Sequence, residues 1–154
     1  MPLIIIIFST FICYQIYFQK VIAKKIPSKR KQKIFRILKV RFQGLKENNL
    51  GFFEYQIDNK NILFEYKTIR NKNNFSNILK IYLDISNIED DIKKLCKIHF
   101  YCSNIDNRDW VGLHVKAFYG SLNNLAKNSD KTLHEIISDT ETYISIKRAE
   151  RDKK

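Results

Sequence analysis

The chain has 154 residues, of which 44% are hydrophobic and 29% charged, which is enough for one compact domain and excludes a disordered chain. Its four glycines stand singly, which excludes the clustered glycines of a phosphate-binding loop or a dinucleotide fingerprint; they are Gly44, Gly51, Gly112 and Gly120. A formal net charge of +12 suggests a partner that carries negative charge.

The positive charge is confined to the first third of the chain. Residues 1–46 contain eleven basic residues and no acidic one, whereas residues 47–154 contain 17 basic and 16 acidic residues, a net charge of +1. The excess charge therefore belongs to one segment and not to the surface of the whole domain. A body that is nearly neutral disfavours nucleic acid as the partner and leaves the basic segment as its only plausible contact.

The chain begins with an apolar segment, and its first 18 residues carry no charged side chain. As a helix, residues 3–23 would span roughly 30 Å, the thickness of the hydrocarbon core of a bilayer. Tyr14, Tyr17 and Lys20 would then lie at the membrane interface. We therefore expect residues 1–26 to form a single transmembrane anchor. A cleaved secretory signal and a buried helix or strand of the core remain as alternatives.

A basic cluster follows the apolar segment, where Pro27 and Ser28 are expected to interrupt any helix. We predict that residues 27–33 form a juxtamembrane linker. Loops rich in Lys and Arg stay on the cytoplasmic side of a membrane, which predicts a cytoplasmic domain. The same cluster is predicted to bind anionic lipid headgroups, at about 1 kcal/mol for each basic residue. Its members are Lys24, Lys25, Lys29, Arg30, Lys31 and Lys33.

Residues 34–154 are predicted to form one α+β domain that begins with strands. Residues 34–42 alternate imperfectly, which fits either a strand or a continuing amphipathic helix. Residues 52–69 predict a β-hairpin, because alternating apolar residues flank the turn-forming run Asp58-Asn59-Lys60-Asn61. A third strand is predicted over residues 78–85, after an Asn-rich loop.

Helices are predicted in the second half of the domain. Ser86 stands three residues before Glu89, as in a capping box, and predicts a helix from about residue 87. Residues 110–119 predict a further strand. The last thirty or so residues predict a C-terminal helix, which residues 128–130 could divide in two. We expect an antiparallel sheet of about four to five strands with two helices on one side of it.

Cys96, His99 and Cys102 are spaced three residues apart, and all three residue types bind zinc. A structural zinc site needs a fourth ligand, however, and Cys96 also fits the buried stripe of the predicted helix. We therefore predict neither a metal site nor a cofactor.

No spacing in the sequence places a general base beside a nucleophile. A small hydrolase that uses His114 or His134 with the loop acids Asp106 and Asp109 remains an alternative. The sequence therefore favours a protein that is not an enzyme, and no catalytic residue is predicted.

The aromatic residues of the predicted strands allow a stacking platform for single-stranded nucleic acid. Strand aromatics are more often core residues, and Glu54 and Glu65 on the same strands would repel phosphate. The platform would consist of Phe53, Tyr55, Phe64, Tyr66 and Tyr82.

The main hypothesis from the sequence is a single-pass membrane protein whose cytoplasmic α+β domain is an interaction or accessory module. Its partners would be anionic lipid and an unidentified protein. One alternative is a basic nucleic-acid-binding domain with residues 3–23 in its core. The other alternative is the small hydrolase.

Overall fold

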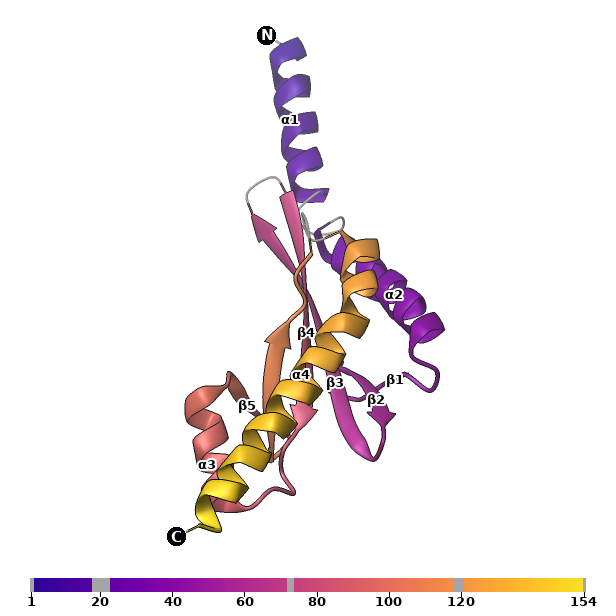
Figure 1. Cartoon of the computed structure of the whole chain (residues 1–154). Coiled ribbons are helices and arrows are strands. Elements are labelled where there is room, and N and C mark those ends of the chain that lie inside the picture. The colour runs from indigo at the N-terminus through magenta and orange to yellow at the C-terminus, as the bar shows by residue number, and fades with distance from the viewer. Residues whose placement is uncertain (1, 18–22, 72–73, 118–120, 154) are drawn as a thin grey trace.

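The computed structural model describes residues 2–17, 23–71, 74–117 and 121–153, which form four helices and six strands (Figure 1). The helices are α1 (Pro2–Tyr17), α2 (Ala23–Arg41), α3 (Asp90–His99) and α4 (Leu122–Arg151). The strands are β1 (Lys46–Glu47), β2 (Phe53–Ile57), β3 (Lys60–Asn71), β4 (Asn74–Asp84), β5 (Cys102–Ile105) and β6 (Arg108–His114).

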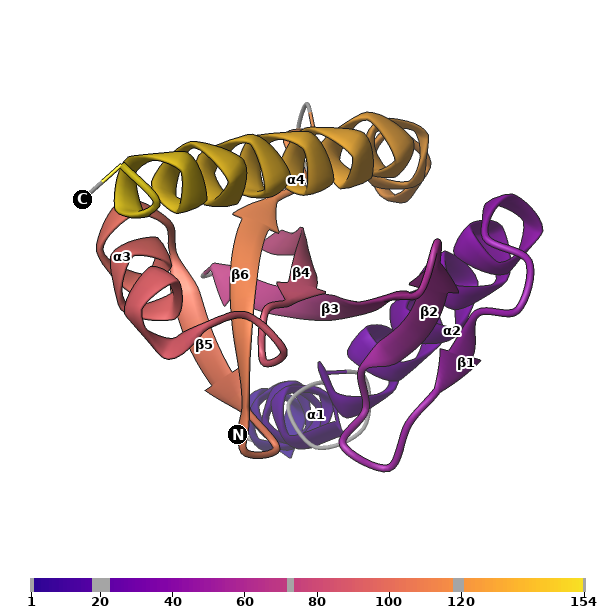
Figure 2. The same ribbon diagram turned by 60° about the horizontal axis from the view of Figure 1, so that its bottom comes forward.

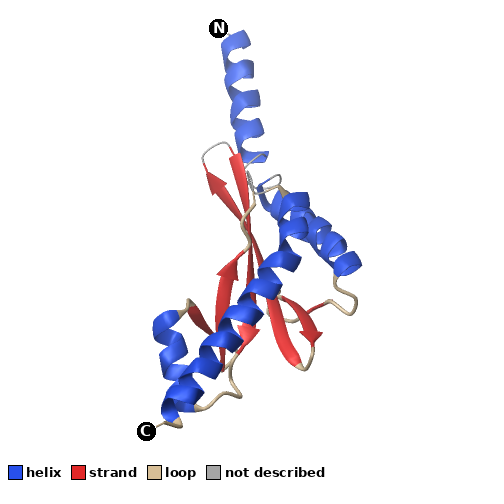
Figure 3. Cartoon of the chain, viewed as in Figure 1, coloured by secondary structure: helices blue, strands red, loops and turns tan. Residues whose placement is uncertain are grey.

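The strands form one antiparallel sheet in the order β1-β2-β3-β4-β6-β5, shown in red in Figure 3. Asp58 and Asn59 both have positive φ (48° and 61°), as a two-residue hairpin turn requires, and confirm the predicted hairpin. Asp106 and Asn107 form a second turn of this kind between β5 and β6. The α+β class and the antiparallel sheet are therefore confirmed, with the short edge strands β1 and β5 in addition.

One face of the sheet carries the main core. Alternate residues of β4, namely Leu79, Ile81 and Leu83, are buried on the side where α4 packs. Figure 2 shows α4 running across this side of the sheet, with α3 toward one end and α2 toward the other. On the opposite face, Leu63 and Trp110 belong to a smaller apolar cluster that no described helix covers.

The segment predicted as a linker is part of helix α2 instead, and for residues 34–42 the structure confirms the amphipathic helix, the alternative to a weak strand, as far as Arg41. Ile34, Leu38 and Phe42 are spaced four residues apart and are buried, so they lie on one side of a helix and pack in the core. Pro27 does not end the helix. It is the fifth residue of α2, and its missing N–H removes a single backbone hydrogen bond, the one to the carbonyl of Ala23.

The predicted transmembrane anchor is wrong. Helix α1 has 16 residues, which corresponds to a length of about 24 Å, less than the roughly 30 Å of a bilayer core. No helix within the described residues is long and apolar enough to span a membrane. The predicted single-pass membrane protein, with its membrane localisation and cytoplasmic domain, is therefore not supported.

The alternative that buries residues 3–23 in the core is also wrong for the side chains that the structure describes. Ile6, Phe8 and Phe11 of α1 are each about 60% exposed or more (60%, 66% and 60%). Residues 18–22, the end of the predicted apolar segment, lie outside the described residues.

Two helix boundaries differ from the predictions. Helix α3 begins at Asp90, and its N-cap residue Glu89 makes no side-chain capping bond, so Ser86 does not form a capping box. Helix α4 continues unbroken through residues 128–130. Within this unbroken helix Ser129 is fully buried, and its hydroxyl donates a hydrogen bond to the Ala126 carbonyl at 2.7 Å.

Candidate nucleic-acid interface

The apolar side of α2 fixes which of its side chains face outward. Because Ile34, Leu38 and Phe42 point into the core, the opposite side of the helix must face solvent. At the end of the helix, Arg41 Nη1 lies 2.9 Å from Asp130 Oδ2, an ion pair that joins α2 to α4. The orientation of the helix is therefore set by packing on one side and by this ion pair at its end.

The outward side of α2 carries a row of cations, which we call the basic face; its members are Lys25, Lys29, Lys33, Arg36 and Lys39. All five are exposed. None of the five makes an ion pair with any described residue. At 1.5 Å per residue, the basic face extends over about 21 Å.

A groove of about 450 Å³ runs beside the basic face, where α2 meets β1. Phe35 lines it, between the cations Lys31, Arg36 and Lys39. The half-buried Phe35 ring packs on Phe53, with ring centroids 4.9 Å apart, and Lys39 Nζ lies 5.9 Å from its centroid. The groove therefore combines an aromatic ring with positive charge, as grooves for single-stranded nucleic acid do.

One acidic residue, Glu47 of β1, lines this groove. Lys31 Nζ lies 2.6 Å from Glu47 Oε1 and also 5.6 Å from the centre of the Phe53 ring. The ion pair neutralises the carboxylate, so that Arg36 and Lys39 leave the groove with net positive charge.

The structure divides the six basic residues predicted to bind lipid. Lys25, Lys29 and Lys33 point outward on the basic face, and the side chain of Lys24 lies outside the described part. Arg30 instead points to β4, where its Nη1 donates hydrogen bonds of 3.2 Å to the Phe75 carbonyl and to Asn77 Oδ1.

Arg36 and Lys39 were not among the predicted site residues. Their helical spacing from Lys29 and Lys33 was the available signal, and the imperfect alternation of residues 34–42 obscured it. The prediction that the six residues bind anionic lipid stays a prediction.

The aromatic residues considered as a stacking platform do not share an exposed face. Phe53, Phe64 and Tyr66 are buried in the main core, and Tyr55 packs 5.2 Å from the ring of Phe42. Tyr82 lies on the other face of the sheet. The aromatic ring that does accompany the cations, Phe35, comes from the helix.

The uncovered face of the sheet holds a cluster of titratable residues that sequence reasoning missed. Tyr82 donates a 2.8 Å hydrogen bond to Glu65 Oε2, and burial together with this bond raises the pKa of Tyr82. Lys80 Nζ lies 3.4 Å from the Tyr101 hydroxyl. Hydrogen bonds with Ser103 and Lys80 lower the pKa of Tyr101. The cross-strand register that brings these side chains together could not be read from the sequence.

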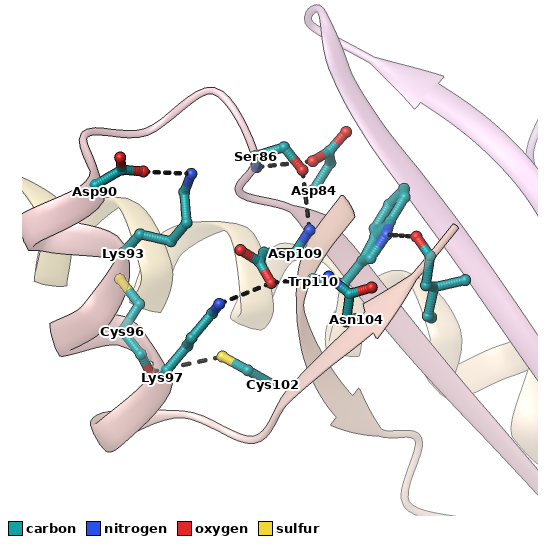
Figure 4. A network of polar contacts seen from close by, with 11 residues as sticks. Asp84, Ser86, Asp90, Lys93, Cys96, Lys97, Cys102, Asn104, Asp109 and Trp110 are labelled. Carbon is teal, nitrogen blue, oxygen red and sulfur yellow. Dashed lines mark hydrogen bonds and ion pairs between the residues drawn. The ribbon is translucent and has the colours of Figure 1, made fainter. Parts of the chain in front are cut away.

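Cys96, His99 and Cys102 do not converge on one point. Cys96 is fully buried, and Cys102 Sγ lies 3.7 Å from the Cys96 carbonyl oxygen (Figure 4). His99 stacks on Tyr143 of α4, with ring centroids 4.4 Å apart. Burial, with a smaller contribution from Cys96, raises the pKa of Cys102 to about 11, so its thiol is protonated at neutral pH. In the described part of the chain, no three His, Cys, Asp or Glu side chains gather as metal ligands.

Asp109, one of the loop acids of the hydrolase alternative, makes contacts that hold elements of the fold together. Its carboxylate lies 2.9 Å from Lys97 Nζ and accepts a bond from Asn104, and its backbone N–H donates to Ser86 Oγ at 3.0 Å (Figure 4). These contacts join α3 and the loop after β4 to β6.

The two histidines of the hydrolase alternative lie apart from these acids. His114 is five residues from Asp109 along β6, a distance of about 17 Å. Burial and the charge of Lys80 lower the pKa of His114. On α4, His134 Nδ1 lies 2.7 Å from the Asp130 carbonyl oxygen, within its own helix. The pairing of histidine and acid that a hydrolase needs is therefore not assembled.

Comparisons with protein-family models, with curated proteins and with solved structures find no match to this chain. The assignment of a function therefore rests on the geometry and charge of the surfaces described above.

Proposed function

We propose that this domain binds single-stranded nucleic acid, with phosphates on the basic face of α2 and a base in the adjoining groove. One observation carries the proposal: the Phe35 ring lies in a groove whose neighbouring side chains are Lys31, Arg36 and Lys39. Single-strand binders use this combination, because cations follow the backbone while an aromatic ring stacks on a base of any sequence.

The spacing of the cations supports a contact along a strand. Lys25, Lys29 and Lys33 are separated by four residues each, a rise of about 6 Å from one cation to the next. Contact with a flat array of lipid headgroups would need these outward cations but would leave the groove and Phe35 unused. The groove therefore favours a strand over an anionic surface.

The proposed binding is tolerant of sequence. Apart from the cations and Glu47, the polar side chains that line the groove are Ser28 and Gln32, which is few for reading the edges of several bases. The cations recognise phosphate, which every nucleotide carries, so affinity should depend on salt more than on base composition.

The test uses the full chain and a fluorescein-labelled 20-nucleotide deoxythymidine strand, with binding measured by fluorescence anisotropy. Replacing Lys25, Lys29 and Lys33 together by Gln should weaken binding at least tenfold, since three phosphate contacts are lost. The matched control replaces Lys94, Lys127 and Lys153 by Gln, three exposed cations that belong to α3, α4 and the C-terminal end and not to α2. This control has the same net charge and should bind within about threefold of wild type.

A second variant tests the stacking role of Phe35. Phe35→Leu keeps an apolar side chain against Phe53 but removes the aromatic face, and should weaken binding about tenfold. An abasic strand of equal length should bind wild type and Phe35→Leu equally. If the variant of Lys25, Lys29 and Lys33 and its charge-matched control lose affinity for the thymidine strand equally, a specific site on α2 is contradicted.

Anionic vesicles test whether lipid headgroups, and not nucleic acid, are the partner of the basic residues. If the Lys25, Lys29 and Lys33 variant loses binding to vesicles of phosphatidylserine and phosphatidylcholine but binds the thymidine strand as wild type does, lipid headgroups are the partner. The nucleic-acid proposal would then be wrong.

A further inference from the structure

Helix α1 presents an apolar surface that no other described element covers. In Figure 1 it extends beyond the end of the sheet, and no other described helix or strand packs along its length. With 3.6 residues per turn, its large side chains from residue 6 onward lie on nearly all sides of the helix. They are all between 49% and 66% exposed; they are Ile6, Ile7, Phe8, Phe11, Ile12, Tyr14, Ile16 and Tyr17.

The area of this apolar surface is as large as a stable protein interface requires. An aromatic side chain has about 150–250 Å² of surface, so the four aromatic residues of α1, each more than half exposed, present roughly 500 Å². The four isoleucines, exposed to a similar degree, raise the total to the order of 800 Å². One partner of a typical stable interface contributes about the same area, whereas a monomer seldom exposes an apolar patch above about 600 Å².

Two hydroxyl groups of α1 are already bonded within the helix. Ser9 Oγ donates a hydrogen bond to the Ile6 carbonyl at 3.0 Å, and Thr10 Oγ1 donates to the same carbonyl at 2.8 Å. Residues 2–17 also include no charged side chain. Burial of α1 against an apolar partner would therefore leave neither hydroxyl unpaired and would remove no charge from water.

A second copy of α1 is the partner that this surface fits. The partner must be apolar and uncharged over a similar length of surface. The other exposed large apolar residues of the described chain are distributed over α2, β3, α3, α4 and two loops, with at most two on any element; they are Val40, Leu50, Ile69, Leu95, Ile98, Tyr101 and Ile146. Within the described part of the molecule, the surface that matches α1 in size and chemistry is thus α1 itself.

The charge of the chain opposes the association of two copies. Each chain has a formal net charge of +12, and residues 20–41, which follow α1, contain ten basic residues and no acidic one. Salt screens this repulsion, because the Debye length falls from about 8 Å at physiological ionic strength to about 3 Å at 1 M. Contact between apolar surfaces is not weakened in this way. Association through α1 should therefore strengthen with salt, whereas binding of nucleic acid should weaken.

We propose that the protein self-associates through α1, so that the α1 helices of two or more copies pack together in a discrete oligomer. A helix that is apolar on nearly all sides is typical of a buried element, and packing of α1 helices against one another provides that burial. The contact uses no residue of the basic face, so it stands apart from the nucleic-acid proposal.

Sedimentation equilibrium of the full chain, from micromolar to submillimolar concentration, tests the proposal. Wild type should reach a constant mass that is a whole multiple of the 18.4 kDa of one chain. Replacing both Ile7 and Phe11 by Gln should weaken self-association at least thirtyfold, because two large apolar side chains per copy leave the interface. Circular dichroism and the fluorescence of Trp110 check that the domain remains folded.

The matched control replaces Val40 and Ile98 by Gln. Both residues are 83% exposed, more than any described side chain of α1, so this variant also removes two exposed apolar side chains. It should self-associate within about threefold of wild type, because α2 and α3 lie outside the proposed contact. In 1 M sodium chloride, the association of wild type should be unchanged or stronger.

Several results would overturn the proposal. Wild type could stay monomeric at every concentration, or its mass could rise without limit, as in nonspecific aggregation. Equal association of wild type and the Ile7 and Phe11 variant, equal loss in that variant and its control, or dissociation in 1 M salt would also contradict it. A monomer that binds vesicles of uncharged phosphatidylcholine, and loses this binding in the Ile7 and Phe11 variant, would show that lipid covers α1 instead.

Discussion

Gly112 provides the space in which two tyrosines of the uncovered sheet face pack. A Cβ atom at Gly112 would lie 2.7 Å from Cε1 of Tyr82, a distance that Cβ atoms essentially never show, and 3.0 Å from Cδ1 of Tyr101, which is a tight contact. Tyr82 is buried and bonds to Glu65, so its ring cannot move without loss of that bond. The absence of a side chain at this one position therefore allows the whole cluster to form.

Gly112→Ala should lower the free energy of unfolding by about 1–3 kcal/mol, because the added methyl group overpacks the site. Urea unfolding followed by the fluorescence of Trp110, the single tryptophan, measures the change. A variant as stable as wild type would show that the two rings can move aside without cost.

Thr140→Val should raise the free energy of unfolding by about 1 kcal/mol, because it removes a buried hydroxyl that has no partner. Ser129→Ala is the matched control. Ser129 is equally buried in α4, but its hydroxyl is bonded at 2.7 Å, so its removal should lower stability by about 1 kcal/mol. Destabilisation by both substitutions would mean that Thr140 has a partner in solution.

At the level of the elements, local patterns predicted the sheet better than the helices. The turn at Asp58 and Asn59 and the alternation in β4 confirmed the predicted hairpin and third strand, because both signals depend on neighbouring residues. Helix α2 was predicted only as one of two alternatives for residues 34–42, because Pro27 resembles a helix end and the core decides between the two spacings of the buried residues.

The candidate site was predicted only in part. Lys25, Lys29 and Lys33 were identified from their charge, whereas the groove depends on where β1 places Glu47 and on how Phe35 meets Phe53. These are tertiary contacts between segments that the sequence does not show to be neighbours. The apolar character of α1 was clear from the sequence.

Asp109 links α3 to β6, and its ion pair makes this link dependent on pH. The hydrogen bond with Lys97 is the largest cause that lowers the pKa of Asp109. A carboxyl group whose pKa is lower in the folded state than its ordinary 3.8 stabilises the fold above that pH. This stabilisation is lost as the pH falls through the pKa of the folded state.

Asp109→Asn should therefore lower the free energy of unfolding at pH 7 by up to about 1 kcal/mol. The difference from wild type should vanish in acid, once the pH lies well below 3.8. Asp139→Asn, at an exposed position of α4 with no ion pair to a described residue, should match wild type at both pH values. A constant difference between Asp109→Asn and wild type across the pH range would contradict the role of this ion pair.

For the whole molecule, the separation of charge is the feature with functional consequences. The first 46 residues hold eleven basic residues and no acidic one, while the rest of the chain is nearly neutral. The fold places five of these cations on the outward side of one helix, next to a groove with an aromatic ring. Binding of a polyanion should therefore depend on this side of the molecule alone.

The dependence of affinity on salt tests this account most directly. If about five cations of the basic face contact phosphates, a plot of log affinity for the thymidine strand against log salt concentration should have a slope of roughly −3.5. Replacing Lys25, Lys29 and Lys33 by Gln should reduce the slope to roughly −1.4, and the Lys94, Lys127 and Lys153 control should retain the wild-type slope. A slope that is the same in all three proteins would contradict a phosphate-binding face on α2.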